Sequence, residues 1–157
     1  MLIRNVLFVC TGNICRSPTA EGVARVIAKR GSVAHRFKFD SAGTHGYHVG
    51  EPPDPRSVEA AAKRGYDLSS LRARRVNDFD FVAFDYLLAM DRTHLDLLRS
   101  ACPVQYRQKL GLFLDYDEGR DEDEVPDPYY GGPQGFDHVL DLVEGAAKGL
   151  ITRLTQK

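Results

Sequence analysis

Two patterns of apolar residues meet near the start of the chain. Residues 6–9, Val-Leu-Phe-Val, form a short continuous apolar run that predicts a buried strand. From residue 20 onward the apolar positions follow the i, i+3, i+4, i+7 spacing of a helix, at Ala20, Val23, Ala24 and Ile27. Ser17 suits the N-cap of that helix, Pro18 its first turn and Gly31 its end. The pattern therefore predicts a strand, a short loop and a helix.

Strands and helices continue to alternate along the rest of the chain. Apolar residues at 37–41, 86–90 and 110–114 predict three further strands. Further helices are predicted from Pro55, capped by Asp54, to Gly65, from an Asp91 cap to near Pro103, and over residues 136–154. The helix after Asp91 should place Leu95, Leu97 and Leu98 toward the core. The helix over 136–154 carries an apolar stripe of Phe136, Val139, Leu140, Val143, Ala147, Leu150, Ile151 and Leu154.

This order of elements predicts an α/β fold with a parallel sheet flanked by helices. The first two strands are joined by a helix, so their connection should be a right-handed crossover. In an open parallel sheet, binding sites form at the carboxyl ends of the strands, where residues 10 and 41 both fall. Residues 1–157 are expected to form a single compact domain, because the length suits one core and no boundary or repeat interrupts the pattern.

Composition excludes several classes of function. The 21 basic and 22 acidic residues are balanced, which gives no electrostatic case for a nucleic-acid partner or for an anionic membrane. No run reaches membrane-spanning length, and no secretory signal is recognisable at the start of the sequence. Three cysteines do not make a disulfide scaffold, so a reduced, cytoplasmic location is expected.

The loop between the first strand and the first helix has the chemistry of a phosphate site. Backbone N–H groups of the loop and of the helix N-terminus point at one spot, with the positive end of the helix dipole behind them. Gly12 lets the backbone turn, and Arg16 can hold two phosphate oxygens at once. The same positive field stabilises a thiolate at Cys10. The alternative is that Cys10 and Cys15 are buried apolar residues and Arg16 is a surface charge.

These residues resemble a known family. The run Val-Leu-Phe-Val-Cys-Thr-Gly-Asn-Ile-Cys-Arg-Ser-Pro at residues 6–18 looks like the signature of the low-molecular-weight protein tyrosine phosphatases, and Asp-Pro-Tyr-Tyr-Gly at 127–131 looks like their general-acid motif. The resemblance covers essentially the whole chain and implies the strand order 2-1-3-4. It also implies hydrolysis of phosphotyrosine and small aryl phosphates, with Cys10 as nucleophile, Arg16 as phosphate clamp and Asp127 as general acid and base.

Other site residues follow from the same resemblance. The phosphate-binding loop would include Thr11, Gly12, Asn13, Ile14, Cys15 and Ser17, with Ser41 supporting it. Candidates for contact with the substrate ring are Tyr47, Tyr129 and Tyr130, although Tyr47 could equally be an exposed loop residue. The family carries a bracing His at the position of Leu71, so the bracing of the loop must differ here. The acidic stretch 115–124 is expected to be a solvated loop that could also repel acidic substrates.

Cys15 offers a possible redox function. A curled loop allows the Cα atoms of Cys10 and Cys15 to come within about 7 Å, close enough for a disulfide. We therefore expect peroxide to form a reversible Cys10–Cys15 bridge that protects Cys10 from further oxidation. Cys15 could instead serve only in packing. Cys102 is expected to be a structural or surface thiol.

Alternative functions are weakened by particular residues. Arginine phosphatases of this family typically have Thr where this chain has Ile14, and arsenate reductases on this scaffold need two further cysteines where only Cys102 is available. A catalytically silent phosphotyrosine-binding module would not need Cys10, Arg16 and Asp127 together. Zinc would need four ligands, which the cysteines and histidines do not supply at a suitable spacing. No cofactor or metal is expected, and a tyrosine autokinase is a possible partner by family analogy.

Overall fold

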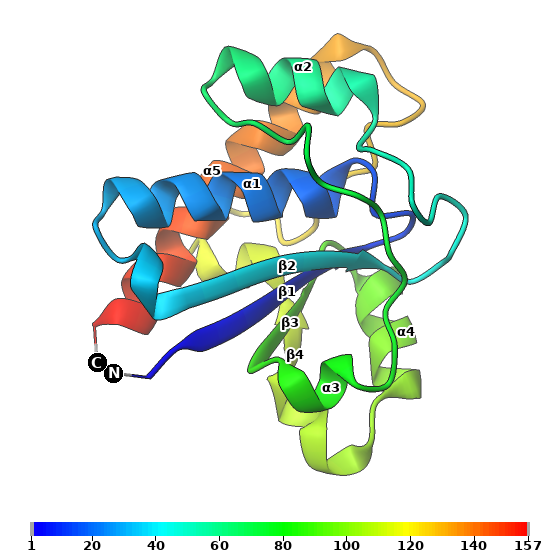
Figure 1. Cartoon of the computed structure of the whole chain (residues 1–157), viewed down its shortest axis with the longest axis vertical. Helices are drawn as coiled ribbons and strands as arrows, with labels where there is room; N and C mark the ends of the chain where they lie inside the picture. Colours follow the sequence, from blue (N-terminus) through cyan, green and yellow to red (C-terminus); the bar gives the residue numbers. More distant parts are fainter. Residues whose placement is uncertain (1, 157) are drawn as a thin grey trace.

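The computed structural model describes residues 2–156, and its centre is a four-stranded parallel sheet (Figure 1). The strands are β1 Arg4–Cys10, β2 Phe37–Gly43, β3 Tyr86–Ala89 and β4 Leu110–Leu112. Their order in the sheet is β2-β1-β3-β4. The expected α/β fold class and strand order are therefore confirmed, and β1 occupies an interior position between β2 and β3.

Helices cover both faces of this sheet. The helices are α1 Arg16–Arg30, α2 Pro55–Lys63, α3 Asp80–Ala83, α4 Arg92–Ala101 and α5 Pro133–Thr155. Short 3-10 turns lie at η1 Ala34–Arg36, η2 Val104–Lys109 and η3 Phe113–Tyr116. Figure 1 shows α1, α2 and α5 on one side of the sheet and α3 and α4 on the other. No helix within residues 2–156 is long and apolar enough to cross a membrane.

The side chains of the apolar run in β1 pack in two different cores, one on each face of the sheet. Val6 and Phe8 belong to the core beneath α1 and α5, whereas Leu7 and Val9 belong to the core beneath α3 and α4. All four side chains are fully buried. Successive side chains of a strand point to opposite faces, so an interior strand covered on both faces must be apolar throughout.

Some boundaries and faces differ from the prediction. β2 continues two residues beyond Ser41 to Gly43, because its last residues still pair with β1. The fourth strand ends at Leu112 rather than residue 114, since the chain turns there into η3. In α4 the buried positions are His94 and Leu98, four residues apart, whereas Leu97 is exposed. The expected apolar face of α4 was therefore wrong for Leu97 and overlooked His94.

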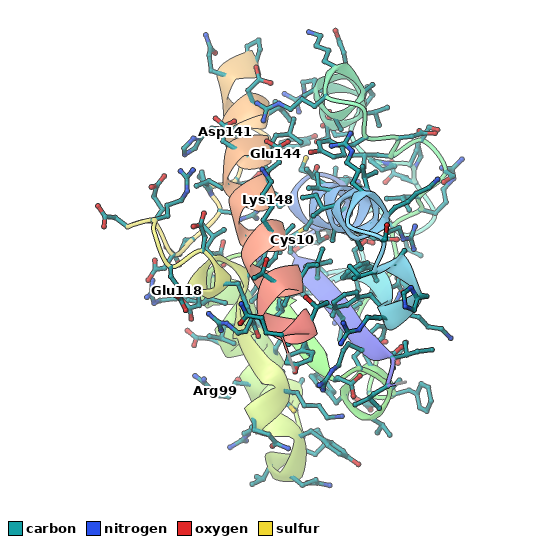
Figure 2. All side chains as sticks on the ribbon, turned by 90° about the vertical axis from the view of Figure 1, so that its left-hand side faces the viewer. Cys10, Arg99, Glu118, Asp141, Glu144 and Lys148 are labelled. Atoms are coloured by element: carbon teal, nitrogen blue, oxygen red, sulfur yellow. The ribbon has the colours of Figure 1, made fainter. Side chains whose placement is uncertain are left out.

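Ion pairs and a hydrogen bond hold the C-terminal end of α2 against α5. Arg64, the C-cap of α2, lies 2.9 Å from Asp141 and 2.7 Å from Glu144, and Tyr66 donates a hydrogen bond to the same Glu144. Asp141, Glu144 and Lys148 follow one another along α5 in Figure 2. Asp54 caps the opposite end of α2 by accepting from the Arg56 N–H. These contacts therefore fix α2, whose N-terminal end adjoins the loop after β1.

Candidate active site

Cys10 is the last residue of β1, and its thiol lies beneath the first turn of α1. The sulfur is 3.0 Å from the Ser17 hydroxyl, and the Ser17 N–H points at it from 3.4 Å. Two donors at a helix N-terminus stabilise a negative charge on sulfur. The predicted N-cap was wrong: α1 begins at Arg16 with Cys15 in the cap position, because the Ser17 side chain is turned toward Cys10.

Asn13 determines the shape of the loop. Its φ of 60° lies in the left-handed region, which Asn tolerates better than most residues. Its side-chain amide donates to Ser17 at 2.8 Å and to Ser41 at 3.0 Å, while its carbonyl oxygen accepts from the Arg74 N–H at 3.0 Å. The Ser41 hydroxyl in turn donates to buried Glu21 at 2.7 Å. Side-chain hydrogen bonds therefore fix the loop from three directions.

The loop is braced without a histidine at position 71. Leu71 packs against the apolar core on the α1 side. The brace comes instead from the backbone N–H of Arg74, which contacts Asn13, while the Arg74 guanidinium pairs with Asp40 at 3.1 Å and Asp80 at 3.0 Å. A backbone donor carries no titratable proton, so this contact is independent of pH.

Arg16 joins the loop to two other segments. The whole residue is only 4% exposed. Nη1 donates to Asp91 at 2.9 Å and to the Val125 carbonyl at 3.0 Å, and Nη2 lies 3.8 Å from Asp127. Two segments, the one that follows β3 and the one that holds Asp127, thus orient one guanidinium fork of the loop. Sequence reasoning missed Asp91 in this role, although its place directly after β3 puts it at the carboxyl end of a strand.

His94 is a second residue that sequence reasoning missed. Its Nε2 is 2.7 Å from the Thr11 hydroxyl and 3.4 Å from Arg16 Nη2. Burial, reinforced by the Arg16 charge, lowers the pKa of His94 from 6.5 to about 4. Nδ1 lies 3.1 Å from Asp91, but among the described residues it has no partner with hydrogen-bond geometry. The imidazole is therefore neutral at physiological pH.

The loop forms the floor of a cleft of about 230 Å³. Asp127 lies at its rim with a half-exposed carboxylate, which accepts from the Tyr129 N–H at 3.0 Å. The cleft is lined by Cys10, Thr11, Gly12, Ile14, Cys15, Arg16, Tyr47, His48, Asp127, Tyr129 and Tyr130. The structure therefore brings the predicted loop, acid and ring-contact residues together around one opening. Asn13, Ser17 and Ser41 lie behind the loop.

The tyrosine rings around the opening of the cleft differ in how exposed they are. Tyr129 is 39% exposed, whereas Tyr47 and Tyr130 are 71% and 90% exposed. Tyr47 stacks on His45 with ring centroids 5.0 Å apart. A Cβ on Gly12 would lie 2.9 Å from the His48 ring, so any other residue there would displace that ring from its place over the loop.

The three cysteines differ in environment. All are free thiols and all are buried. Burial raises the pKa of Cys15 to about 12, so its thiol stays protonated at neutral pH. Cys102 lies at the end of α4 on the opposite side of the sheet from α1. Between residues 2 and 156, no three His, Cys, Asp or Glu side chains are grouped so that they could hold a metal ion.

Comparison with known proteins points to one family. The sequence model described as "Low molecular weight phosphotyrosine protein phosphatase" matches residues 5–157. A low molecular weight protein-tyrosine-phosphatase of Streptomyces coelicolor is 43% identical over 156 residues, which cover 97% of this chain and 94% of that protein. The human low molecular weight phosphotyrosine protein phosphatase is 40% identical over 138 residues, which cover 87% of this chain and 86% of the human one.

Solved structures agree with this match. A protein tyrosine phosphatase from Entamoeba histolytica with Hepes in the active site has a TM-score of 0.93 and 42% identity, covering 96% of each chain. YfkJ from Bacillus subtilis also has a TM-score of 0.93, at 36% identity, covering 99% of this chain and 97% of that one.

Proposed function

Because this chain belongs to the low molecular weight phosphotyrosine protein phosphatase family, whose activity is hydrolysis of phosphotyrosine, we propose that Cys10, Arg16 and Asp127 perform that reaction here. The observation that carries the assignment is their placement around one cleft. The Cys10 sulfur lies 3.0 Å from the Ser17 hydroxyl and accepts from the Ser17 N–H at 3.4 Å, and Arg16 lies 3.8 Å from the Asp127 carboxylate. The phosphoprotein substrate presents its tyrosyl ring to the aromatic rim of this cleft.

In the first step the Cys10 thiolate attacks phosphorus in line with the tyrosyl oxygen. A sulfur–phosphorus bond forms and the phosphorus–oxygen bond to the ring breaks. Asp127, protonated at the start, donates its proton to the leaving phenolic oxygen. Arg16 and the backbone N–H groups of the loop hold the three equatorial oxygens, where negative charge is distributed in the transition state.

In the second step water releases the phosphate. Asp127, now a carboxylate, takes a proton from the attacking water, and the sulfur–phosphorus bond breaks. The Ser17 hydroxyl and N–H receive the returning thiolate. Ser41 acts through Asn13, whose left-handed backbone it helps to hold. Inorganic phosphate leaves, and the enzyme returns to its starting state.

The substrate class is tested by phosphate release from three matched peptides carrying phosphotyrosine, phosphoserine or phosphoarginine. Wild type and Cys10→Ser are compared at mildly acidic and neutral pH. We expect release from the phosphotyrosine peptide alone, and none from Cys10→Ser, which should still bind a phosphate analogue. Turnover by Cys10→Ser would exclude Cys10 as nucleophile, and preference for phosphoarginine would show that Ile14 does not discriminate.

We also propose a partner and a location for the protein. A tyrosine autokinase is a suitable partner by analogy with the family, since its phosphotyrosines would fit the cleft. Three free cysteines, one of them the nucleophile, suit a reducing cytoplasm. Residues 1–157 constitute one catalytic domain in this proposal.

The Cys10–Cys15 pair is proposed as a redox safeguard. Peroxide oxidises Cys10 to a sulfenic acid and is itself reduced to water. The Cys15 thiolate then attacks the Cys10 sulfur and displaces hydroxide, which takes a proton from solvent, to form the disulfide. Because the pKa of Cys15 is about 12, little thiolate is present at neutral pH, and bridge formation should accelerate as pH rises. Peptide mass mapping after mild peroxide treatment tests the pair. Sulfinic or sulfonic acid at Cys10 without any bridge would contradict it.

A further inference from the structure

A second cavity, of about 690 Å³, lies along the edge strand of the sheet. It lies between the C-terminal half of α1 and the first half of β2, which run side by side in Figure 1. On β2 it spans residues 37–40, whereas Cys10 is level with Gly43. Phe39 is four residues before that level, or about 13 Å along the strand. The cavity and the cleft at Cys10 have no lining residue in common.

The walls of this cavity, here called the β2 cavity, combine positive charge with aromatic surface. Arg25, Lys29 and Lys38 contribute three cations against the single carboxylate of Asp40. Neither lysine pairs with a carboxylate within the described part of the chain. Phe37 and Phe39 stack with centroids 5.1 Å apart at the inner wall, each only 7% exposed, and half-buried Phe84 adds a third ring to the lining. Positive charge beside aromatic rings, in a cavity of small-molecule size, suits a flat aromatic anion.

A chain of hydrogen bonds leads from this cavity to the catalytic loop. Arg25 donates to the Phe39 carbonyl at 2.9 Å and pairs with Glu21 at 2.6 Å. Glu21 accepts from the Ser41 hydroxyl at 2.7 Å, and Ser41 accepts from the Asn13 amide at 3.0 Å. The Arg25–Glu21 pair lies within α1, and the next two bonds join α1 to β2 and β2 to the loop. A change at Arg25 therefore reaches Asn13 through two intermediates.

A second chain leads to the same residue. Asp40 pairs with the Arg74 guanidinium at 3.1 Å, and the Arg74 N–H donates to the Asn13 carbonyl oxygen at 3.0 Å. Asn13 then donates to Ser17, whose hydroxyl contacts the Cys10 sulfur. Both charged residues that connect the β2 cavity to the interior are thus linked to the left-handed residue of the loop.

We propose that the β2 cavity binds an aromatic anion and that its occupation slows the reaction at Cys10. A bound carboxylate or phosphate competes with Glu21 for Arg25. Glu21 is only 3% exposed, and burial already raises its pKa, so weakening its pair with Arg25 favours the protonated acid. A neutral Glu21 is a weaker acceptor for the Ser41 hydroxyl. The support of Asn13, and with it the loop geometry, then loosens.

Binding is tested with 2-naphthoate, an aromatic anion that the enzyme cannot hydrolyse. Orthovanadate first fills the catalytic loop of the full chain, and amide NMR shifts are then followed during titration. We expect shifts at residues 37–40 and at Phe84, and about tenfold weaker binding in Lys29→Glu/Lys38→Glu. The matched control Lys63→Glu/Lys148→Glu reverses two exposed lysines elsewhere and should bind as wild type does. No shifts at the cavity, or equal affinity in all three proteins, would overturn the site.

Coupling is tested by steady-state hydrolysis of p-nitrophenyl phosphate with and without saturating 2-naphthoate. We expect kcat to fall about fivefold with KM nearly unchanged, and half of that fall to require about tenfold more 2-naphthoate in Lys29→Glu/Lys38→Glu than in wild type. An increase in KM alone would mean competition at the Cys10 cleft, and an unchanged kcat would mean an uncoupled site. Either result would overturn the coupling. Binding to the vanadate-filled protein does not depend on turnover, so this test is separate from that of the catalytic assignment.

Discussion

In the proposed mechanism Arg16 binds the phosphate and lies beside Asp127, the proton donor. One of its nitrogens is held by Asp91 and by the Val125 carbonyl, and the other lies near Asp127. Val125 is fully buried, and its N–H donates to the Met90 carbonyl. Asp127 therefore lies two residues after Val125, the residue that anchors this segment to the end of β3.

Replacing Asp127 should reveal its function through the leaving group. For phenyl phosphate, whose leaving group needs a proton, Asp127→Ala should lower kcat by roughly 10²–10⁴. For p-nitrophenyl phosphate, whose leaving group is stable as an anion, the loss should be much smaller. Asp121→Ala, which removes an exposed carboxylate of the same loop, is the control and should match wild type on both substrates. Equal losses on both substrates would remove Asp127 from proton transfer.

The sequence alone identified the site residues that lie close together in one motif, and it missed those that lie elsewhere. Cys10, Arg16 and Ser17 lie within eight residues, so strand, loop and helix signals all pointed to them. Asp91, His94 and Glu21 are far from the motif or buried within a helix. Their roles arise only when β3, α4 and β2 are placed beside β1, and no local pattern encodes that placement.

His94 should make stability depend on pH. The folded protein keeps His94 neutral down to about pH 4, whereas the unfolded chain binds a proton below about pH 6.5. Stability should therefore fall as pH decreases through this window, by on the order of 3 kcal/mol at about 1.4 kcal/mol per pH unit. Denaturant unfolding at about pH 7 and pH 4.5 should show a smaller fall for His94→Asn than for wild type or the exposed control His35→Asn. Identical falls would assign the proton to another group.

At the scale of elements, local sequence signals predicted whether a segment is a helix or a strand better than they predicted where it begins and ends. Asp54 and Asp91 cap α2 and α4 as their positions suggested. Ser17 does not cap α1, because its hydroxyl contacts Cys10, and β2 runs past Ser41 because β1 continues beside it. Helix and strand type follow from periodicity, but the last residues of an element depend on its neighbours.

The packing of α5 on η3 gives a test at this scale. Replacing Gly by Ala inside a helix usually stabilises it by about 1 kcal/mol. At Gly149 the added methyl would overlap the carbonyl oxygen of Tyr116, a backbone atom, so Gly149→Ala should destabilise the protein by about 1–3 kcal/mol. Gly135→Ala in the same helix meets only Pro128, at 3.5 Å or more, and should be neutral or slightly stabilising. Thermal unfolding that ranked Gly149→Ala at or above wild type would contradict the close packing.

At the scale of the whole molecule, the site depends on the sheet order. With β1 between β2 and β3, the end of β1 is flanked by Ser41 and Gly43 on one side and by Met90 and Asp91 on the other. The sequence could predict parallel strands joined by helices, and the family resemblance supplied their order. The β2 cavity was not predicted, since it depends on side chains of α1 and β2 that carry no motif.

An oxyanion in the cleft should therefore stabilise the fold as a unit, because its ligands come from β1, α1 and the Asp127 segment. Orthovanadate at about 100 times its Kd should add about 2.7 kcal/mol to the free energy of unfolding, which raises Tm by about 5–11 °C in a domain of this size. In Arg16→Lys the bidentate fork is lost, so most of the increase should disappear at the same vanadate concentration. Differential scanning calorimetry of both proteins measures the effect. If the increase were equal in Arg16→Lys, vanadate would be acting outside the loop.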